Sequence, residues 1–350
     1  MRQLLILLMI QFSFGLTAQN NFTFHYNKGV ESFNKGEYSE AIGNFNNALK
    51  YRKESNNQYK VAGALKERAL SKMHLKNYSS ALKDIDEALE LKPEYTELYY
   101  ARSLVHIENK EYDKAIEWAD KGLEIKPENE DLMINKIEAS LLKKDYPNAV
   151  SFSDSLLKVN PRSIPALNVK ANALEHQKKY KESIAVYTKV IEIDPQNIEA
   201  FFNRGVSYAD DKNFDAALAD MERAMAIDTA ARWVGYNNIA FFIKFEQKDY
   251  VGAMEYFDKS IKQNPKFSNA YNNRGFAKLQ LKDLKGAKAD ISKAQELDPE
   301  NSYACRTMAL YLIADNKTKQ ACEQLEKALK LGYANEYDDE VDNLIKLHCK

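Results

Sequence analysis

The chain has 350 residues, of which 45% are hydrophobic, 29% charged and 11% aromatic, and its 50 Lys and Arg balance 51 Asp and Glu. This ordinary globular composition excludes a disordered chain, a collagen-like fibre and a multi-span membrane protein. The formal net charge of −1 argues against a nucleic-acid partner, because phosphate neutralisation needs an excess of basic residues.

The N-terminal segment has the pattern of a secretory signal peptide. Arg2 is followed by the apolar run Leu4–Ile10, and small residues precede Gln19. The run is shorter than the ~20 residues that a comfortable membrane span needs. We therefore expect residues 1–18 to be removed after Ala18, which leaves an exported, periplasmic or secreted chain without a membrane span. Retention of the segment as an uncleaved anchor is the alternative.

A period of 34 residues organises the chain after residue 21. It appears in the prolines Pro93, Pro127, Pro161 and Pro195, and again in Pro265 and Pro299. We count nine units in 22–335, which begin near residues 22, 62, 96, 130, 164, 198, 233, 268 and 302. The excess over the strict period is six residues near Ser55–Val61, plus single insertions before Trp233 and in the turn before Tyr250.

Each unit is predicted to form two amphipathic helices. In the sixth unit, residues 199–210 and 215–227 carry apolar side chains at helical spacing, and Lys212-Asn213 forms the turn between them. Asp194-Pro195 closes one unit and opens the next, since proline suits the first turn of a helix. The small residues Gly205 and Ala217 lie opposite each other, where the paired helices must approach closely.

These units resemble the tetratricopeptide repeat family. The segments that carry the resemblance best run from Tyr271 to Pro299, starting Tyr-Asn-Asn-Arg-Gly, and from Phe201 to Asp228, starting Phe-Phe-Asn-Arg-Gly. The resemblance covers residues 22–335 and implies an all-α, right-handed solenoid whose first helices line a concave groove. Residues 336–350 are predicted to form the capping helix that such arrays need.

Arginine and aspartate recur together, sixteen residues apart, on the two helices of one unit. The pairs are Arg68 with Asp84, Arg204 with Asp220, and Arg274 with Asp290. A bidentate contact is geometrically reasonable at this spacing. An acid–base pair for catalysis would not be copied three times along an array, so we interpret these residues as structural ion pairs.

Asparagine recurs at the sixth place of the units. The residues are Asn27, Asn135, Asn203, Asn238 and Asn273, with Asn237 and Asn272 one place earlier. The family resemblance places the sixth residue in the groove, where amide donors and acceptors could pair with the backbone of an extended peptide. Phe202, Phe241 and Phe276 would add apolar contacts between these amides. The alternative is an asparagine-rich composition without a binding role.

Other kinds of site receive little support. The family's clamp for a ligand carboxylate uses cations at the second and sixth places, and the corresponding residues here are Glu199, Val234, Asn269 and Thr307. We therefore expect no carboxylate clamp. A glycine-rich phosphate loop, a His-Glu-x-x-His motif and paired zinc cysteines are absent from the sequence. We accordingly expect no catalytic residue, metal or cofactor.

The three cysteines, Cys305, Cys322 and Cys349, all lie in the last 46 residues. In an oxidising compartment, a disulfide could tie the C-terminal helix to the preceding one, and Cys322 with Cys349 is our preferred pair. Spacing alone does not settle connectivity, so three buried free thiols remain the alternative.

The sequence as a whole favours an exported, non-enzymatic scaffold that binds an extended peptide or protein segment in its groove. The identity of that partner is not predicted. Self-association into a structural homo-oligomer is the rival hypothesis, and an enzyme ranks last.

Overall fold

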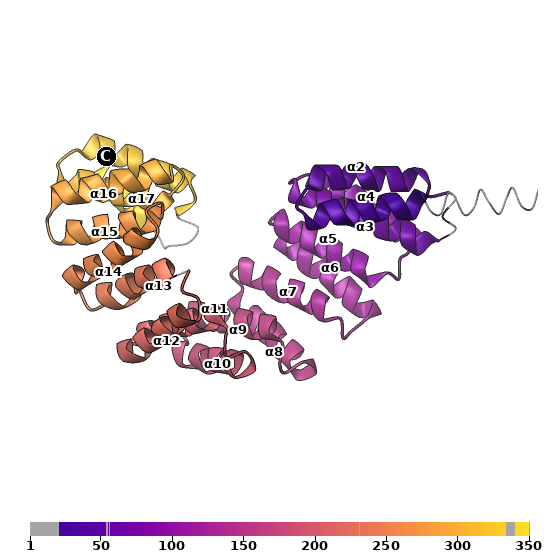
Figure 1. Cartoon of the computed structure of the whole chain (residues 1–350), viewed down its shortest axis with the longest axis horizontal. Coiled ribbons are helices and arrows are strands. Elements are labelled where there is room, and N and C mark those ends of the chain that lie inside the picture. Colours follow the sequence, from indigo (N-terminus) through magenta and orange to yellow (C-terminus); the bar gives the residue numbers. More distant parts are fainter. Residues whose placement is uncertain (1–20, 54, 56, 231, 334–339, 350) are drawn as a thin grey trace, which may run out of the picture. The chain divides into compact units, whose positions relative to one another are not determined.

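The computed structural model describes residues 21–53, 55, 57–230, 232–333 and 340–349 (Figure 1). The predicted signal peptide lies outside the described residues, as do the first residues of the predicted capping segment. Within the described ranges every regular element is a helix, and no helix is long and apolar enough to span a bilayer. The chain is an all-α solenoid that divides into two compact units, residues 1–178 and 179–350.

The first unit contains the helix at residues 21–34 and eight further helices. These are α2 (Tyr38–Lys50), α3 (Gln58–His74), α4 (Tyr78–Leu91), α5 (Thr96–Glu108), α6 (Tyr112–Ile125), α7 (Glu130–Leu142), α8 (Tyr146–Val159) and α9 (Ile164–His176). Consecutive helices contact one another along the chain, and the first helices of neighbouring pairs also contact each other, as α5 does with α7.

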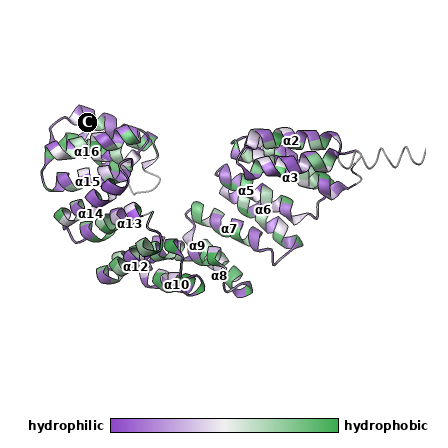
Figure 2. Cartoon of the chain, viewed as in Figure 1, coloured by the Kyte–Doolittle hydropathy of each residue, from purple (hydrophilic) through white to green (hydrophobic). Residues whose placement is uncertain are grey.

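The second unit continues the alternation from α10 to α19. Its helices are α10 (Tyr180–Ile193), α11 (Ile198–Asp210), α12 (Phe214–Ile227), α13 (Arg232–Asn238), the π-helix η1 (Ile239–Phe245), α14 (Tyr250–Gln263), α15 (Ser268–Gln280), α16 (Leu284–Leu297), α17 (Ser302–Ala314), α18 (Thr318–Lys330) and α19 (Glu340–His348). The bounds of α11 and α12 differ from the predicted ones by a single residue at their starts. Figure 2 shows hydrophobic and hydrophilic residues mixed along each helix, as amphipathic packing requires.

In each repeat, the turn between the first and the second helix contains one residue with a positive φ. The first is Gly36 at φ 77°, and the others are Lys76, Lys110, Lys144, Lys178, Lys212, Lys248, Lys282 and Asn316. The left-handed residue lets the next amide reach back across the helix end, as in the 2.9 Å bond from the Asn77 amide to the Lys72 carbonyl. These nine turns coincide with the nine predicted units.

The six-residue excess near Ser55–Val61 partly becomes helix. The helix α3 begins at Gln58, four residues before the predicted start of its unit, and the Asn57 side chain caps it by accepting from the Lys60 amide at 3.1 Å. The additional turn of helix therefore lengthens the first helix of the second repeat.

The insertion expected in the turn before Tyr250 lies elsewhere, and that prediction is wrong. The turn keeps its normal geometry at Lys248, while the preceding helix changes to π geometry over Ile239–Phe245. A π-helix closes its hydrogen bonds over one more residue than an α-helix, so it absorbs an added residue without breaking the helix.

Burial identifies the inserted residue as Phe241. In the regular sixth repeat the buried residues Gly205 and Ser207 are two positions apart in the sequence. In the seventh repeat the buried residues Ala240 and Ile243 are three positions apart. Between Ala240 and Ile243, Phe241 is 39% exposed. The π-helix thus pushes this phenylalanine out of the core packing.

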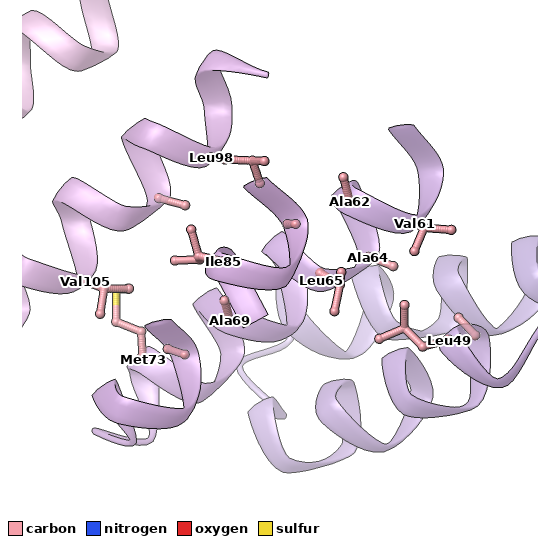
Figure 3. Close-up of a cluster of buried hydrophobic side chains, with 14 of the residues drawn as sticks. Leu49, Val61, Ala62, Ala64, Leu65, Ala69, Met73, Ile85, Leu98 and Val105 are labelled. Atoms are coloured by element: carbon pink, nitrogen blue, oxygen red, sulfur yellow. The ribbon is translucent and has the colours of Figure 1, made fainter. Parts of the chain in front are cut away.

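The core of each repeat forms where the small residues of one helix meet the partner helix. A Cβ added at Gly205 would lie 3.2 Å from the Ala217 carbonyl oxygen, which explains the small residue predicted at this crossing. In the first unit, Leu65, Ile85 and Leu98 are fully buried and come from three successive helices (Figure 3). Each helix pair therefore completes its core with the next one.

The structure places each predicted arginine against its aspartate. Both Asp84 oxygens accept from Arg68, at 2.7 and 2.8 Å, and the same bidentate geometry joins Arg204 to Asp220 and Arg274 to Asp290. The three carboxylates are at most 7% exposed as residues. These pairs therefore join the two helices of one repeat in a largely buried position.

The same seventh-place cation also reaches the preceding repeat, which the sequence analysis did not anticipate. It contacts an acceptor sixteen residues earlier in the chain. The pairs are Arg102 with Asp86, Lys136 with Asp120, Lys170 with Asp154, Arg204 with Thr188, and Arg274 with Asp258. We call this series the inter-repeat ladder.

In two of these repeats, an aromatic ring replaces the aspartate that would pair with the cation within the same repeat. The Arg102 guanidinium lies 3.9 Å from the centroid of the Trp118 ring, and the Lys136 ammonium lies 4.0 Å from that of Phe152. Both rings occupy the position that Asp84 has in its own repeat. A cation–π contact therefore substitutes for the ion pair within the repeat.

Replacement of Asp220 by alanine should destabilise the protein by about 3 kcal/mol, because it leaves the Arg204 guanidinium buried without its carboxylate. The matched control is Asp86→Ala, which should cost less than about 1 kcal/mol because the Asp86 side chain is 54% exposed. Urea unfolding followed by helical circular dichroism measures both. The double variant Arg204→Met/Asp220→Leu should recover most of the loss, and equal costs for the two single variants would contradict this interpretation.

The C-terminal helix α19 packs on α18, as expected of a cap. Val341 is 1% exposed within the last hydrophobic cluster, and Leu344 and Ile345 pack against that cluster. The Sγ atoms of Cys322 and Cys349 are bonded, so the structure has the preferred disulfide, and Cys305 is a buried free thiol. The cap is thereby covalently tied to the last repeat.

Candidate functional site

The first helices of successive pairs contact one another within each unit, for example α3 with α5 and α15 with α17. We call the surface formed by these helices the first-helix face. A hollow lies on this face in each unit, and most of the predicted groove residues of the second unit lie in or beside its hollow.

The hollow of the second unit has a volume of about 210 Å³. We call it the aromatic hollow. Four rings line it, Phe241 from η1, Phe276 from α15, Tyr303 from α17 and Tyr333 after α18. Its polar lining consists of Asn272, Asn273, Arg306, Thr307 and Glu340.

The asparagines of the aromatic hollow form a small amide network. The Asn273 Nδ2 donates to Asn237 Oδ1 at 3.1 Å, and its Oδ1 accepts from Asn272 Nδ2 at the same distance. Asn237 is 9% and Asn272 5% exposed, so these two fifth-place residues hold Asn273 in position from beneath. Asn272 Oδ1 is buried and has no hydrogen-bond partner among the described residues.

Asn203 and Asn238 occupy the same sixth place in the two preceding repeats. Both side chains are partly exposed, and neither makes a side-chain hydrogen bond within the described part of the chain. Their amides are therefore available to a ligand. Phe202 packs partly against the core cluster around Met221 and would touch a Cβ added at Gly235, so it supports this surface from within.

Asn135 does not join this surface, and the role predicted for it is corrected. It lies in the first unit, is 2% exposed, and its amide donates to the Tyr100 carbonyl at 3.1 Å. Because its donor is used between neighbouring first helices, Asn135 has a structural role here.

Arg306 brings a positive charge into the aromatic hollow. Its Nε donates to Glu340 Oε2 at 3.2 Å, and its Nη2 donates to Glu340 Oε1. The Tyr333 hydroxyl donates to Glu340 Oε2 at 2.8 Å. Burial alone would raise the pKa of Glu340, but the Arg306 and Tyr333 hydrogen bonds outweigh it and hold that pKa below its usual value.

The first unit has its own hollow of about 380 Å³, which we call the tyrosine hollow. Tyr26, Tyr59 and Tyr95 line it together with Phe22 and Asn27. The Tyr59 ring lies edge-on to Tyr95, and the Lys92 ammonium lies 4.2 Å from the centroid of the Tyr59 ring. Burial, aided by the charge of Glu67, raises the pKa of the Tyr26 hydroxyl. This hollow presents aromatic surface with hydroxyl groups, and Lys60 also lines it.

Sequence reasoning missed both the tyrosine hollow and Arg306. The repeat pattern does not distinguish these tyrosines from core residues, although Tyr26 lies at the fifth place of its repeat and adjoins Asn27 at the sixth. Arg306 occupies the fifth place of its repeat, whereas the family's carboxylate clamp uses the second and sixth places, so the clamp pattern does not reveal it. Inspection of the fifth place in every repeat would have found Arg306.

The described residues contain no group of three His, Cys, Asp or Glu side chains that could hold a metal ion. His106, the most buried of the described histidines, bonds through Nδ1 to Glu111 at 2.7 Å. Burial lowers the pKa of His106. Hydrogen bonds from Lys114 and then from His106 lower the pKa of Glu111 to about 2. This pair lies outside both hollows.

Several family models match parts of the chain. Four tetratricopeptide repeat models match residues 66–130, 171–212, 198–230 and 256–289. A model of anaphase-promoting complex (cyclosome) subunit 3 matches residues 108–190. A search of curated proteins finds no match.

Solved structures share the fold at low sequence identity. A tetratricopeptide repeat protein from Parabacteroides merdae is 18% identical, with a TM-score of 0.60 over 73% of this chain and 99% of that one. The Cut9–Hcn1 complex of the anaphase-promoting complex is 14% identical, with a TM-score of 0.49 over 94% of this chain and 76% of that one. YrrB is described as a tetratricopeptide repeat protein with an unusual peptide-binding site. It is 18% identical, with a TM-score of 0.34 over 56% of this chain and 97% of that one.

The repeat models and the Parabacteroides structure agree with the series of helix pairs and left-handed turns described above. The chain therefore has the fold of the tetratricopeptide repeat proteins, and repeat models of that family match several of its parts.

Proposed function

We propose that this chain is an exported, non-enzymatic scaffold that binds an extended peptide or protein segment on the first-helix face of its second unit. The observation that carries the proposal is the set of partly exposed sixth-place amides, Asn203, Asn238 and Asn273, in three consecutive repeats. The amides of Asn203 and Asn238 make no side-chain hydrogen bond among the described residues, and the Asn273 amide keeps a second donor and a second lone pair beside its two hydrogen bonds. Such groups offer donors and acceptors to a peptide backbone regardless of its side chains.

The surroundings of these amides support a peptide ligand. The aromatic hollow offers ring surface beside Asn273, and rings supply much of the energy at protein interfaces. Export rests on the signal-peptide pattern of residues 1–18, and the Cys322–Cys349 disulfide suits an oxidising compartment. Tetratricopeptide repeats generally mediate interactions between proteins, which agrees with the proposed scaffold role.

The triple variant Asn203→Ala/Asn238→Ala/Asn273→Ala should abolish capture of partners from the exported protein fraction of the native organism, while helical circular dichroism stays unchanged. The reason is that backbone pairing needs all three amides in register. A matched control replaces three exposed residues of the second helices, Lys189, Glu222 and Glu255, with alanine and should capture normally. Unchanged capture by the asparagine variant would exclude the proposed groove.

Self-association is the alternative and makes a different prediction. Sedimentation that depends on concentration in the absence of any partner, and that is unaffected by the asparagine variant, would favour a homo-oligomeric array.

A further inference from the structure

Glu340 of α19 fills an anion-binding position inside the aromatic hollow. Its two oxygens accept from two nitrogens of Arg306 and from the Tyr333 hydroxyl. A guanidinium that holds a carboxylate in two-point contact is a strong and direction-specific arrangement. The position is therefore suited to a carboxylate, whichever molecule supplies it.

The cation is fixed independently of Glu340. The Arg306 side chain is 16% exposed, and its guanidinium lies 4.8 Å from the centroid of the Phe276 ring. The ring holds the cation against the wall of the hollow. Arg306 would remain directed into the hollow when the Glu340 carboxylate leaves.

Asn272 supplies a second unmet requirement in the same hollow. Its Oδ1 is a buried acceptor without a partner among the described residues, while its Nδ2 is used by Asn273. Buried polar atoms are almost always paired, so an isolated acceptor calls for a donor from outside. The backbone N–H of a bound peptide is such a donor.

Glu340 is held in a way that allows it to be replaced. Its side chain is 41% exposed, and it is the first residue of the short helix α19. Val341 in the core and the Cys322–Cys349 disulfide keep α19 attached to the last repeat. The Glu340 carboxylate can thus leave Arg306 while α19 stays in place. Because Glu340 belongs to the same chain, its high local concentration lets it compete with any ligand carboxylate for Arg306.

We propose that the aromatic hollow is the subsite for an aromatic side chain and an adjacent carboxylate of the peptide ligand, and that Glu340 occupies it until the ligand displaces it. This inference rests on the proposed peptide-binding function. It replaces the expectation that the chain has no carboxylate site, because Arg306 at the fifth place supplies the cation that the second and sixth places lack.

The test uses the full chain and the dipeptide acetyl-Phe-Glu-amide, with acetyl-Phe-Gln-amide as the uncharged control. Glu340→Gln removes the internal competitor and should tighten binding of the acidic dipeptide by about tenfold, because a charge-assisted hydrogen bond to Arg306 becomes free. Adding Arg306→Gln to that variant should abolish the gain. Ligand-observed NMR titration gives the three dissociation constants.

The control dipeptide should bind the parent chain and the Glu340→Gln variant equally. Unchanged circular dichroism and a single reactive thiol, Cys305 after denaturation, would show that α19 and its disulfide are intact. Equal binding of the acidic dipeptide to both chains, or no binding to Glu340→Gln at millimolar concentration, would overturn the inference. Partner capture that still depends on the three asparagines would then leave the proposed function standing.

Discussion

Deletion of Phe241 should leave the free energy of unfolding within about 1 kcal/mol of the parent value, whereas deletion of Val206 should cost more than about 4 kcal/mol. Both residues lie just after the small buried residue of a first helix, Ala240 and Gly205 respectively. The difference arises because Phe241 is the additional residue of a π-helix and Val206 belongs to a regular α-helix.

Removal of Phe241 lets the segment return to α-helical hydrogen bonding and brings Ile243 into the normal spacing from Ala240. Removal of Val206 rotates every later residue of α11 by about 100°, which takes Ser207 and Ala209 out of the core. Urea unfolding monitored by helical circular dichroism compares the two deletions directly. Similar losses for both would show that the π-helix is not where the added residue resides.

The Phe241 deletion also separates stability from function. Phe241 lines the aromatic hollow, so its removal should weaken ligand binding although the repeat becomes more regular. This outcome would agree with the tendency of π-helical segments to lie at functional sites.

The second large effect is expected at the turns. Replacing Lys76, Lys110, Lys248 and Lys282 together with glycine should stabilise the chain by about 4 kcal/mol, or about 1 kcal/mol each. All four residues have positive φ, between 57° and 65°, where an L-residue pays a steric cost and glycine does not. The more flexible unfolded state of glycine subtracts part of that gain.

The matched control replaces the same four lysines with alanine, which removes the same charges but keeps the Cβ atoms. It should be no more stable than the parent, since alanine retains the steric cost. Denaturation midpoints in urea, at low and high salt, distinguish the two sets. A stabilisation shared by the alanine set would mean that charge repulsion between turns, and not backbone strain, had been relieved.

Much of the fold could be predicted because the repeat constrains it. The spacing of Arg204 and Asp220 predicted their contact correctly, since one period fixes how far apart two positions of a helix pair lie. The single insertion was predicted in the turn before Tyr250, because an added residue usually destabilises a turn less than a helix. The neighbouring core around Ala240 and Ile243 instead accommodates it within the helix.

The candidate site was less predictable than the fold. Asn203, Asn238 and Asn273 are partly exposed as expected, but Asn135 at the same place is buried, because its amide satisfies the Tyr100 carbonyl of the adjacent helix. Periodicity tells which face a residue occupies and not which neighbour will use its polar atoms. For the same reason the contact of Glu340 with Arg306 could not be foreseen from the repeat pattern.

The inter-repeat ladder limits how such an array could be rearranged. A repeat that carries Arg102, Lys136 or Lys170 is complete only behind a neighbour with an aspartate at the matching position of its second helix. Duplication or exchange of single repeats would therefore keep these contacts only when the donor–acceptor match travels across the new junction, and each exposed pair lost would cost less than about 1 kcal/mol. At Ile239 the seventh place has no cation, so the repeat there accepts a wider range of preceding neighbours.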